Sequence, residues 1–293
     1  MAGTLQLLRR IRTAQNISKT TKAMQMIAAS KLKKAQDAAL SSRPYVEKLL
    51  EVTGNVTKHM ESSTLPMYMR PAKQDGKTLY VAISPDKGLC GGLITNLLKE
   101  VIRSSNSGDS FVTVGRKVEA PVARLSKNLE ASFLFGTTLP KYDVVFPIAK
   151  IIDEQFTSGK VDNVVLISSH FVSLFSQKPH ITNLLPIKPV VNEEPKEKVQ
   201  TMTTKQENKF QLFEPDVETI LPDLLKRYME MTLYQEILES YLAEQAARLL
   251  SMQNATSNAK EIIEDLKLEY NKTRQAKITS EILDITGASA ASN

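Results

Sequence analysis

The residues of this chain that are best suited to chemistry are few, and their spacing in the sequence predicts neither a catalytic set nor a metal-binding set. Cys90 is the only cysteine, which excludes an internal disulfide, a CxxC zinc site and a dithiol switch. The histidines, His59, His170 and His180, lack the close spacing typical of zinc ligands. Cys90 has no histidine beside it, so a packed thiol is favoured over a nucleophile.

Acidic pairs occur at Glu193–Glu194 and at Glu264–Asp265. The first pair lies in a polar segment and the second on a lysine-rich helical face, where solvated charge is a better interpretation than acid–base catalysis. We therefore expect no catalytic residue, no bound cofactor and no metal ion.

A glycine-rich turn, SPDKGLCGG at Ser84–Gly92, lies between an expected strand and an expected helix. Phosphate-binding loops occur at this position in α/β folds. The glycine spacing matches neither G-x-G-x-x-G nor G-x-x-x-x-G-K-[ST]. The residues favour a tight turn whose glycines let the helix pack closely, and an enzyme that holds a dinucleotide here is the weaker alternative.

The N-terminal segment, from Leu5 to about Met60, has the pattern of a long helix. No Gly or Pro occurs between Thr4 and Arg43, and Pro44 then predicts a kink or an interruption. Apolar residues step by three and four, and many of the neighbouring positions are small, which indicates close packing on another helix. The expected contact positions are Leu8, Ile11, Ala14, Ile17, Thr21, Met24, Ile27 and Leu32.

The C-terminal segment, from Pro222 to about Thr286, has a still longer pattern, in which seam residues alternate at steps of four and three. At 1.5 Å per residue this helix is roughly 95 Å long, so it must project from the folded body. The simplest way to bury both seams is to pair the two helices antiparallel. The seam consists of Leu224, Tyr228, Met231, Gln235, Leu238, Leu242, Gln245, Leu249, Met252, Thr256, Ala259, Ile263, Leu266, Tyr270 and Thr273.

Between these helices, β-rich apolar runs alternate with amphipathic segments, which predicts a small Rossmann-like α/β domain of about 130 residues with a largely parallel sheet. The fold class is therefore α/β: an antiparallel coiled coil of the N- and C-terminal long helices plus this domain. We divide the chain at residues 1–61, 62–210 and 211–293. Strands are expected at Thr78–Ser84, Phe111–Gly115, Asn163–Leu174 and Ile181–Pro189, helices near Leu93–Ser104, Lys117–Ser126 and Val144–Thr157, and a polar loop at Asn192–Lys209.

The net charge of +6 is concentrated near the N-terminus, and such a stripe predicts an acidic partner: nucleic acid, anionic lipid or protein. The stripe lacks the aromatic residues of a base-stacking surface and the bulky apolar face of a membrane-surface helix. A solvated helix face and a basic coiled-coil nucleic-acid-binding protein stay open as alternatives. The basic residues before Asp37 include Arg9, Arg10, Arg12, Lys19, Lys22, Lys31, Lys33 and Lys34.

Four motifs carry a family resemblance. The segment Leu8–Gln36, with KAMQMIAASK inside it, resembles the N-terminal helix of gamma subunits of F-type ATP synthases. DKGLCGG at Asp86–Gly92 is similar to the glycine-rich turn of that family, although Pro85 is unusual beside it. Ala243–Ala259 and Tyr270–Ala288 resemble its two C-terminal signatures, and all four motifs occur in the expected order.

This resemblance implies a central rotor shaft that turns inside a hexamer of alternating alpha and beta subunits and couples proton transport to ATP synthesis. The chain would be non-catalytic, since ATP is made on the beta subunits. Its partners would be the alpha and beta subunits, an epsilon-type subunit and the membrane c-ring, with no nucleic acid and with the membrane reached only through the complex.

The resemblance also assigns partner-contact residues one by one. Lys22 and Met24 match the motif that passes an acidic loop of the beta subunits, and Arg248 matches an arginine of the same region. Arg274, Gln275 and Thr279 match the upper signature, where polar side chains meet a beta-subunit loop, and Glu281 lies in that stretch. Lys272 stands where many relatives carry Arg, which keeps the charge but weakens bidentate contacts.

The same family resemblance gives an expectation for the cellular location. Phe171–Pro189 looks closer to bacterial and plastid members, and the two regulatory cysteines of the plastid type are absent. No apolar run approaches the roughly 20 residues that span a bilayer, and no secretory signal or transit-like segment follows Met1. We expect the cytoplasmic face of a bacterial plasma membrane, with an organelle inner or thylakoid membrane second.

Overall fold

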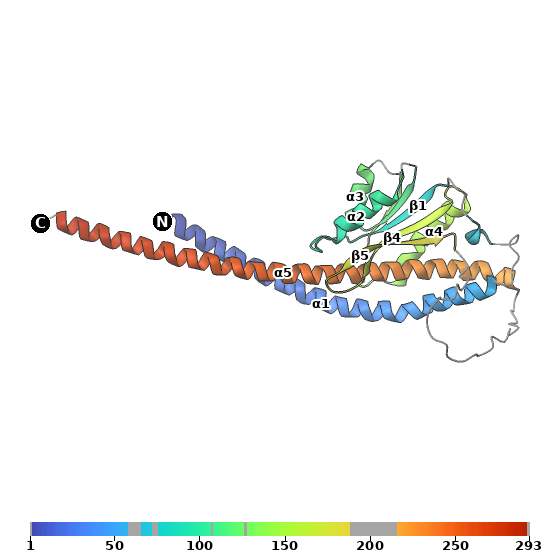
Figure 1. The fold of residues 1–293 in the computed structure, drawn as a ribbon, viewed down its shortest axis with the longest axis horizontal. Helices are drawn as coiled ribbons and strands as arrows, with labels where there is room; N and C mark the ends of the chain where they lie inside the picture. The colour runs from blue at the N-terminus through green and yellow to red at the C-terminus, as the bar shows by residue number, and fades with distance from the viewer. Residues whose placement is uncertain are drawn as a thin grey trace, which may run out of the picture.

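Two long helices determine the shape of the molecule (Figure 1). The computed structural model describes residues 2–57, 66–71, 76–106, 108–125, 128–187 and 216–291. Helix α1 (Ala2–Thr57) has 56 residues and helix α5 (Val217–Ala291) has 75, so α5 is about 110 Å long at 1.5 Å per residue. The start of α1 and the end of α5 lie at the same end of the molecule, so the helices are antiparallel. The predicted fold class is confirmed.

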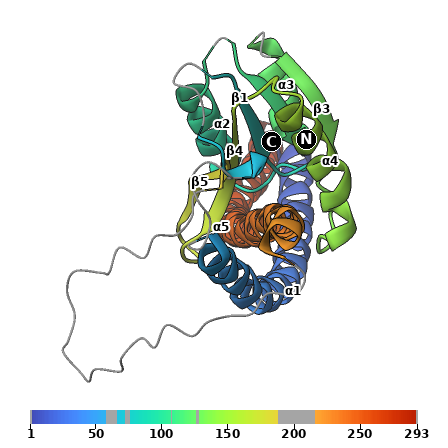
Figure 2. The same ribbon diagram turned by 90° about the vertical axis from the view of Figure 1, so that its right-hand side faces the viewer.

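The seam predicted for α5 is confirmed, because none of its positions is exposed. From Gln235 to Ala247 every residue of α5 is buried. Figure 2, viewed along the long axis, shows the reason: α5 lies between α1 on one side and the sheet on the other. A helix covered on opposite faces needs small or apolar residues around most of its circumference.

The seam of α1 differs from the prediction. Leu8, Ile17 and Ile27 are 36%, 51% and 56% exposed, and Ile17 and Ile27 border grooves beside α5 instead of lying in the buried contact. The positions that face inward follow strict steps of four and three, and most of them are small or polar. They are Leu7, Ile11, Ala14, Ser18, Thr21, Gln25, Ala28, Leu32, Ala35, Ala39 and Ser42. The prediction was wrong at these three exposed positions, and the half-buried Met24 also lies outside the heptad seam, because the prediction selected the largest apolar side chains instead of the heptad period.

Helix α1 continues through Pro44 and Gly54 to Thr57, so of the kink or interruption expected at Pro44, the interruption is absent. Proline removes one backbone hydrogen bond from a helix interior. Side chains just before it bind α5: Ser42 donates to Gln235, and Arg43 Nη2 lies 2.6 Å from Glu239 Oε1. These contacts hold α1 on α5 across the proline.

The middle of the chain forms a five-stranded sheet within the described residues, in the order β3-β2-β1-β4-β5. Strands β1 (Thr78–Ile83), β2 (Ser110–Val114), β3 (Asn128–Phe133) and β4 (Asn163–Phe171) are parallel, and β5 (Gln177–Leu185) runs antiparallel to β4. Helices α2 (Leu93–Ser104) and α3 (Arg116–Arg124) pack on one face. Helices α4 (Val145–Thr157) and α5 cover the other face. Short 3-10 helices lie at η2 (Met67–Met69) and η3 (Tyr142–Val144).

Three details of this domain differ from the prediction. Strand β3 was not expected, because this half-exposed edge strand lacks a continuous apolar run. Strand β4 ends at Phe171 rather than Leu174, and β5 begins at Gln177, before the expected Ile181. The domain boundaries near residues 61 and 210 and the expected polar loop lie outside the described residues.

The small residues of the α1 seam give a first prediction. Ala35 is 0% exposed, so Ala35→Leu should overpack the contact with α5 and lower the free energy of unfolding by about 1–3 kcal/mol. Ala29 is exposed on the same helix, and Ala29→Leu should change it by less than about 0.5 kcal/mol. Chemical denaturation of the full chain measures both. Equal, small effects would mean that the seam is not closely packed.

Candidate functional site

The glycine-rich turn is docked on α5. Cys90 and Leu93 form a buried apolar cluster with Ala243 and Ala247 of α5. Gly91 has a positive φ of 57°, and a Cβ atom there would lie 2.9 Å from Ser251 Oγ. Burial raises the pKa of the Cys90 thiol, which leaves it protonated and unreactive. The geometry supports the tight-turn interpretation of these glycines.

The carboxylate of Asp86 fills the edge of the sheet where a bound phosphate would lie in a nucleotide-binding domain. It accepts hydrogen bonds from the backbone N–H groups of Arg116, Phe135 and Gly136, at 3.0, 3.3 and 2.8 Å. A fixed negative charge at this position repels an anionic ligand and uses donors that would bind one. The arrangement argues against a dinucleotide site at this turn.

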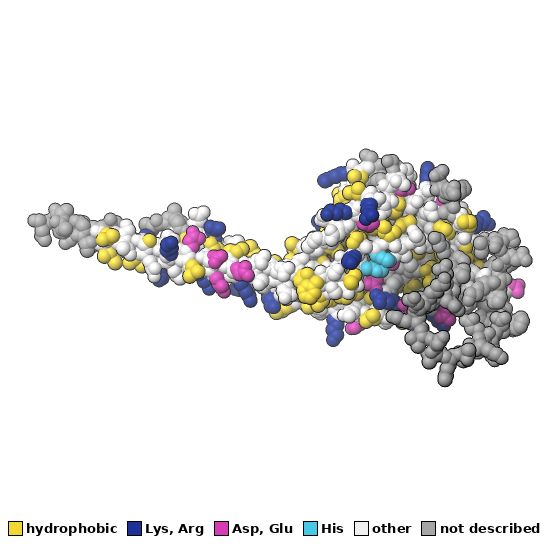
Figure 3. All heavy atoms as spheres, viewed as in Figure 1, with side chains coloured by type: hydrophobic (Ala, Val, Ile, Leu, Met, Phe, Trp, Pro, Cys, Tyr) yellow, Lys and Arg dark blue, Asp and Glu magenta, His cyan; other side chains and the backbone are white. Residues whose placement is uncertain are grey.

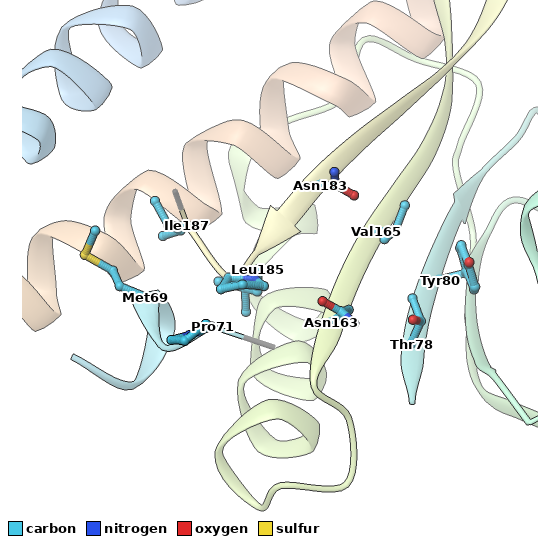
Figure 4. Close-up of a pocket in the computed structure, with 10 residues that line it drawn as sticks. Met69, Pro71, Thr78, Tyr80, Asn163, Val165, Asn183, Leu185 and Ile187 are labelled. Atoms are coloured by element: carbon cyan, nitrogen blue, oxygen red, sulfur yellow. The ribbon is translucent and has the colours of Figure 1, made fainter. Parts of the chain in front are cut away.

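The largest cavity that we describe also lacks catalytic groups. It has a volume of about 550 Å³ and lies at the first residues of β1 and β4 and the last residues of β5 (Figure 4). Polar groups come from Thr78, Tyr80, Asn163 and Asn183, and the Tyr80 hydroxyl donates to the carbonyl of Ser104. None of the described lining residues is charged at neutral pH. Among its described lining residues, the hydroxyls of Thr78 and Tyr80 have no His, Asp, Glu, Lys or Cys beside them that could activate them.

Arg248 ties the glycine turn to α5. Its Nη1 lies 2.6 Å from Glu244 Oε1, and its Nη2 donates to the carbonyl oxygens of Lys87 and Gly88, each at 3.3 Å. Only 13% of the Arg248 side chain is exposed. Burial raises the pKa of Glu244, and the neighbouring Arg248 opposes that rise. The structure therefore gives Arg248 an internal role that its sequence motif did not suggest.

Met24 and Arg248, which lie far apart in the sequence, border the same groove. This groove has a volume of about 190 Å³ and is also lined by Lys31, Lys87 and Glu244. We name it the waist, because it lies where the helical pair leaves the α/β domain. Lys31 donates to the carbonyl of Thr137. The structure thus brings two of the sequence-predicted contact residues together, beside two lysines.

Lys22 lies near the waist but does not line it. Its side chain is exposed and donates to Gln25 Oε1 at 3.3 Å. This contact stays on the surface of α1, so the charge of Lys22 is accessible to a partner.

The upper contact residues lie on a different part of the molecule. Leu7 and Ile11 of α1 pack against Leu266 and Tyr270 of α5, and beyond that cluster α5 extends alone (Figure 1). The side chains of Arg274, Gln275, Thr279 and Glu281 are all exposed on this single helix. The predicted contact residues therefore form two separate sets, one near the waist and one at the tip.

Exposed apolar side chains along the helical pair were missed as functional candidates. Figure 3 shows them between charged residues on the projecting helices. Large apolar side chains left in solvent on a thin rod indicate a surface covered by a partner. A strict heptad count would have separated them from the seam. They include Leu5, Leu8, Ile17, Met26 and Ile27 of α1 and Ile262, Leu268, Ile278, Ile282 and Leu283 of α5.

Comparison with known proteins identifies the family. A family model described as ATP synthase matches residues 4–291. The chain is 40% identical over 294 residues to the ATP synthase gamma chain of Dehalococcoides mccartyi strain CBDB1, with 99% of each chain covered. This chain belongs to the ATP synthase gamma-chain family. The gamma chain of Polynucleobacter asymbioticus is 37% identical over 297 residues, covering 99% of this chain and 100% of that one.

A solved structure agrees with the gamma-chain assignment. A chain from the central stalk and c-ring structure of the Tetrahymena thermophila mitochondrial ATP synthase has a TM-score of 0.59 and 26% identity, covering 80% of this chain and 99% of that chain. The chain is thus a gamma subunit of an F-type ATP synthase, a central-stalk rotor component. This assignment replaces the nucleic-acid-binding and dinucleotide-enzyme alternatives. No described helix of this gamma subunit is long and apolar enough to span a bilayer.

The close approach of the two turns at the sheet edge gives a second prediction. Gly115 has a φ of 104°, and a Cβ atom there would lie 1.9 Å from the carbonyl oxygen of Ser84. Gly115→Ala should therefore lower the free energy of unfolding by about 1–3 kcal/mol or more. Gly88→Ala is the control, because a Cβ atom at Gly88 would have no other atom within 4 Å. Thermal unfolding of both variants tests this prediction. An unfolding midpoint of Gly115→Ala equal to that of the unaltered chain would contradict it.

Proposed function

We propose that this gamma subunit is the non-catalytic shaft that transmits rotation of a membrane ring to an alpha/beta hexamer and so couples ion transport to ATP synthesis. The observation that carries the proposal is the antiparallel pairing of α1 and α5, which makes a rod much longer than the domain at its base. The solved Tetrahymena relative is part of a central stalk with a c-ring. The tip of the rod would lie inside the hexamer, and the α/β domain would face the ring and an epsilon-type subunit.

Torque in this proposal comes from the shape and stiffness of the rod. The contacts at its surface meet three chemically similar catalytic subunits in turn and must release each of them. Exposed ion pairs suit this requirement, because each contributes only about 0–1 kcal/mol. At the exposed tip, Lys277 and Glu281 pair only with each other within α5, at 3.4 Å, and this weak pair leaves both charges accessible to a partner. Individual charges would change the energy barriers between the angles at which the rotating shaft pauses. The push of the rod on the catalytic subunits would supply the torque.

We assign the contact residues to two levels of the hexamer. Lys22, Met24 and Arg248 would lie opposite acidic loops in the lower part of the beta subunits. Arg274, Gln275, Thr279 and Glu281 would meet a beta-subunit loop at the upper end. The lysines around the waist support the first assignment, since they make that groove electropositive. The exposure of all four tip residues supports the second.

The proposed location follows from the same relatives. The gamma chains compared above come from bacteria, and we propose a peripheral position on the cytoplasmic face of a bacterial plasma membrane, reached through the complex. An organelle inner or thylakoid membrane is the alternative. ATP would be made on the beta subunits, and this chain would hold no cofactor of its own.

Assembly is the direct test of the shaft proposal. A tagged full chain should co-purify from its own cells with alpha and beta subunits in a fixed ratio, and the complex should hydrolyse ATP. The isolated chain should have no ATPase activity. Purification as a free protein, or ATP turnover by the chain alone, would contradict the proposal.

Charge at the waist gives a third prediction. Met24 is half-buried beside Lys31 and Lys87, so Met24→Lys adds a positive charge that should bind an acidic partner loop and hinder release. We expect fewer protons pumped per ATP hydrolysed in membrane vesicles. Met24→Leu keeps the volume without the charge and should leave coupling unchanged. Unaltered coupling in Met24→Lys would refute the waist assignment.

A further inference from the structure

Two histidines that are separated in the sequence lie together on the β4–β5 hairpin. Ser168 pairs with His180 and His170 pairs with Lys178 in the strand register. His170 and His180 are therefore diagonal neighbours on the same face of the hairpin. Their ring centroids are 4.1 Å apart and the rings are inclined by 27°. Figure 3 shows histidine side chains at the surface of the α/β domain, open to solvent.

A buried carboxylate from α5 faces the same point. Glu236 is only 6% exposed, and its Oε2 lies 2.8 Å from His170 Nε2. Ser168 Oγ donates to Oε2 at 2.6 Å, and Thr182 Oγ1 donates to Oε1 at 2.9 Å. Burial alone would raise the pKa of Glu236, but these hydrogen bonds lower it, so the group is an oriented carboxylate anion.

We propose that His170, His180 and Glu236 form a binding site for one divalent transition-metal ion of the zinc class. Each residue offers one ligand atom, and these atoms lie within 4.8 Å of one another. Two imidazoles and one carboxylate are a ligand set that zinc and its neighbours in the first transition row prefer. His180 is exposed and the His170 side chain is 30% exposed, which gives the ion an entry path and leaves a coordination position for water.

Binding of the ion requires side-chain rotations within this cluster, because the two imidazole rings are now stacked. Tetrahedral zinc with bonds of about 2.0–2.1 Å places its ligand atoms roughly 3.3 Å apart. The 2.8 Å contact between His170 and Glu236 has to open, and the His170 ring has to turn so that its nitrogen and the carboxylate oxygen both point at the ion. His180 has to move closer, and its exposed side chain can do so by rotating about its χ angles. Ser168 and Thr182 already hold the carboxylate, as the outer-shell donors of metal sites do.

The ion would link three separate elements. Its ligands come from β4, β5 and α5, so it would fasten the edge hairpin of the α/β domain to the shaft helix. A ligand that binds only the folded chain raises its free energy of unfolding. At concentrations above the dissociation constant, this increase grows with the logarithm of the ratio of the ligand concentration to the dissociation constant. The site rests on this geometry and does not depend on the proposed rotary function.

Titration of the metal-free full chain with Zn²⁺, followed by calorimetry, tests the site, with Co²⁺ absorption as a second probe of coordination. We expect one Zn²⁺ per chain and a Co²⁺ spectrum typical of four-coordinate geometry. His180→Gln removes an exposed ligand without touching the His170–Glu236 contact, and it should weaken binding at least about tenfold. His59→Gln is the matched control and should bind as the unaltered chain does.

Two outcomes would overturn the site. One is the absence of a one-to-one Zn²⁺ complex, which would leave a simple His170–Glu236 ion pair. The other is equal affinity in His180→Gln and His59→Gln, which would place the ion elsewhere. Thermal unfolding adds a check, since Zn²⁺ should raise the midpoint for the unaltered chain and His59→Gln but much less for His180→Gln. Glu236→Gln should also lose binding, and His180→Gln decides the matter if that variant fails to fold.

Discussion

The close contact between the small residues of α1 and the seam of α5 is the constraint on which the rest of the structure depends. Ala28, Ala35 and Ala39 are buried against α5, and such residues let two helices approach more closely than leucine would. Hydrogen bonds between Thr21 and Thr256, at 2.8 Å, and between Ser42 and Gln235 fix the register within this seam. Along the paired stretch, two helices in close contact are stiffer than either helix alone, so this part of the rod can transmit rotation.

Helix α5 belongs to the rod and to the α/β domain at once. Its buried stretch packs on the sheet, Glu236 binds the β4–β5 hairpin, and Arg248 holds the glycine turn. The domain therefore has no hinge at α5 across which rotation could be lost. The same region explains why the sheet edge that holds ligands in nucleotide-binding proteins is closed here: Asp86 occupies its backbone donors, and the glycine turn beside it packs on α5.

Features that depend on residues close together in the sequence could be predicted, whereas features that depend on contacts between distant residues could not. The seam of α5 and strands such as β1 follow from local periodicity, whereas the assignment of Met24 and Arg248 as contact residues came from motifs and stays a prediction. The seam of α1 was partly mispredicted because alanine carries little hydrophobic signal, and β3 was missed because its exposed face interrupts the apolar run. Neither the shared groove of Met24 and Arg248 nor the meeting of His170 with His180 is visible without the tertiary fold.

The central claim is that α1 and α5 turn together as one axle, and a covalent link between them tests it most directly. Thr21→Cys with Thr256→Cys places two thiols where the hydroxyls are now 2.8 Å apart, and Cys90 is buried away from them. After oxidation in the assembled complex, the account predicts an intramolecular disulfide and undiminished ATP-driven proton pumping. Loss of pumping that returns on reduction would show that the helices must move relative to each other, which contradicts a single rigid shaft.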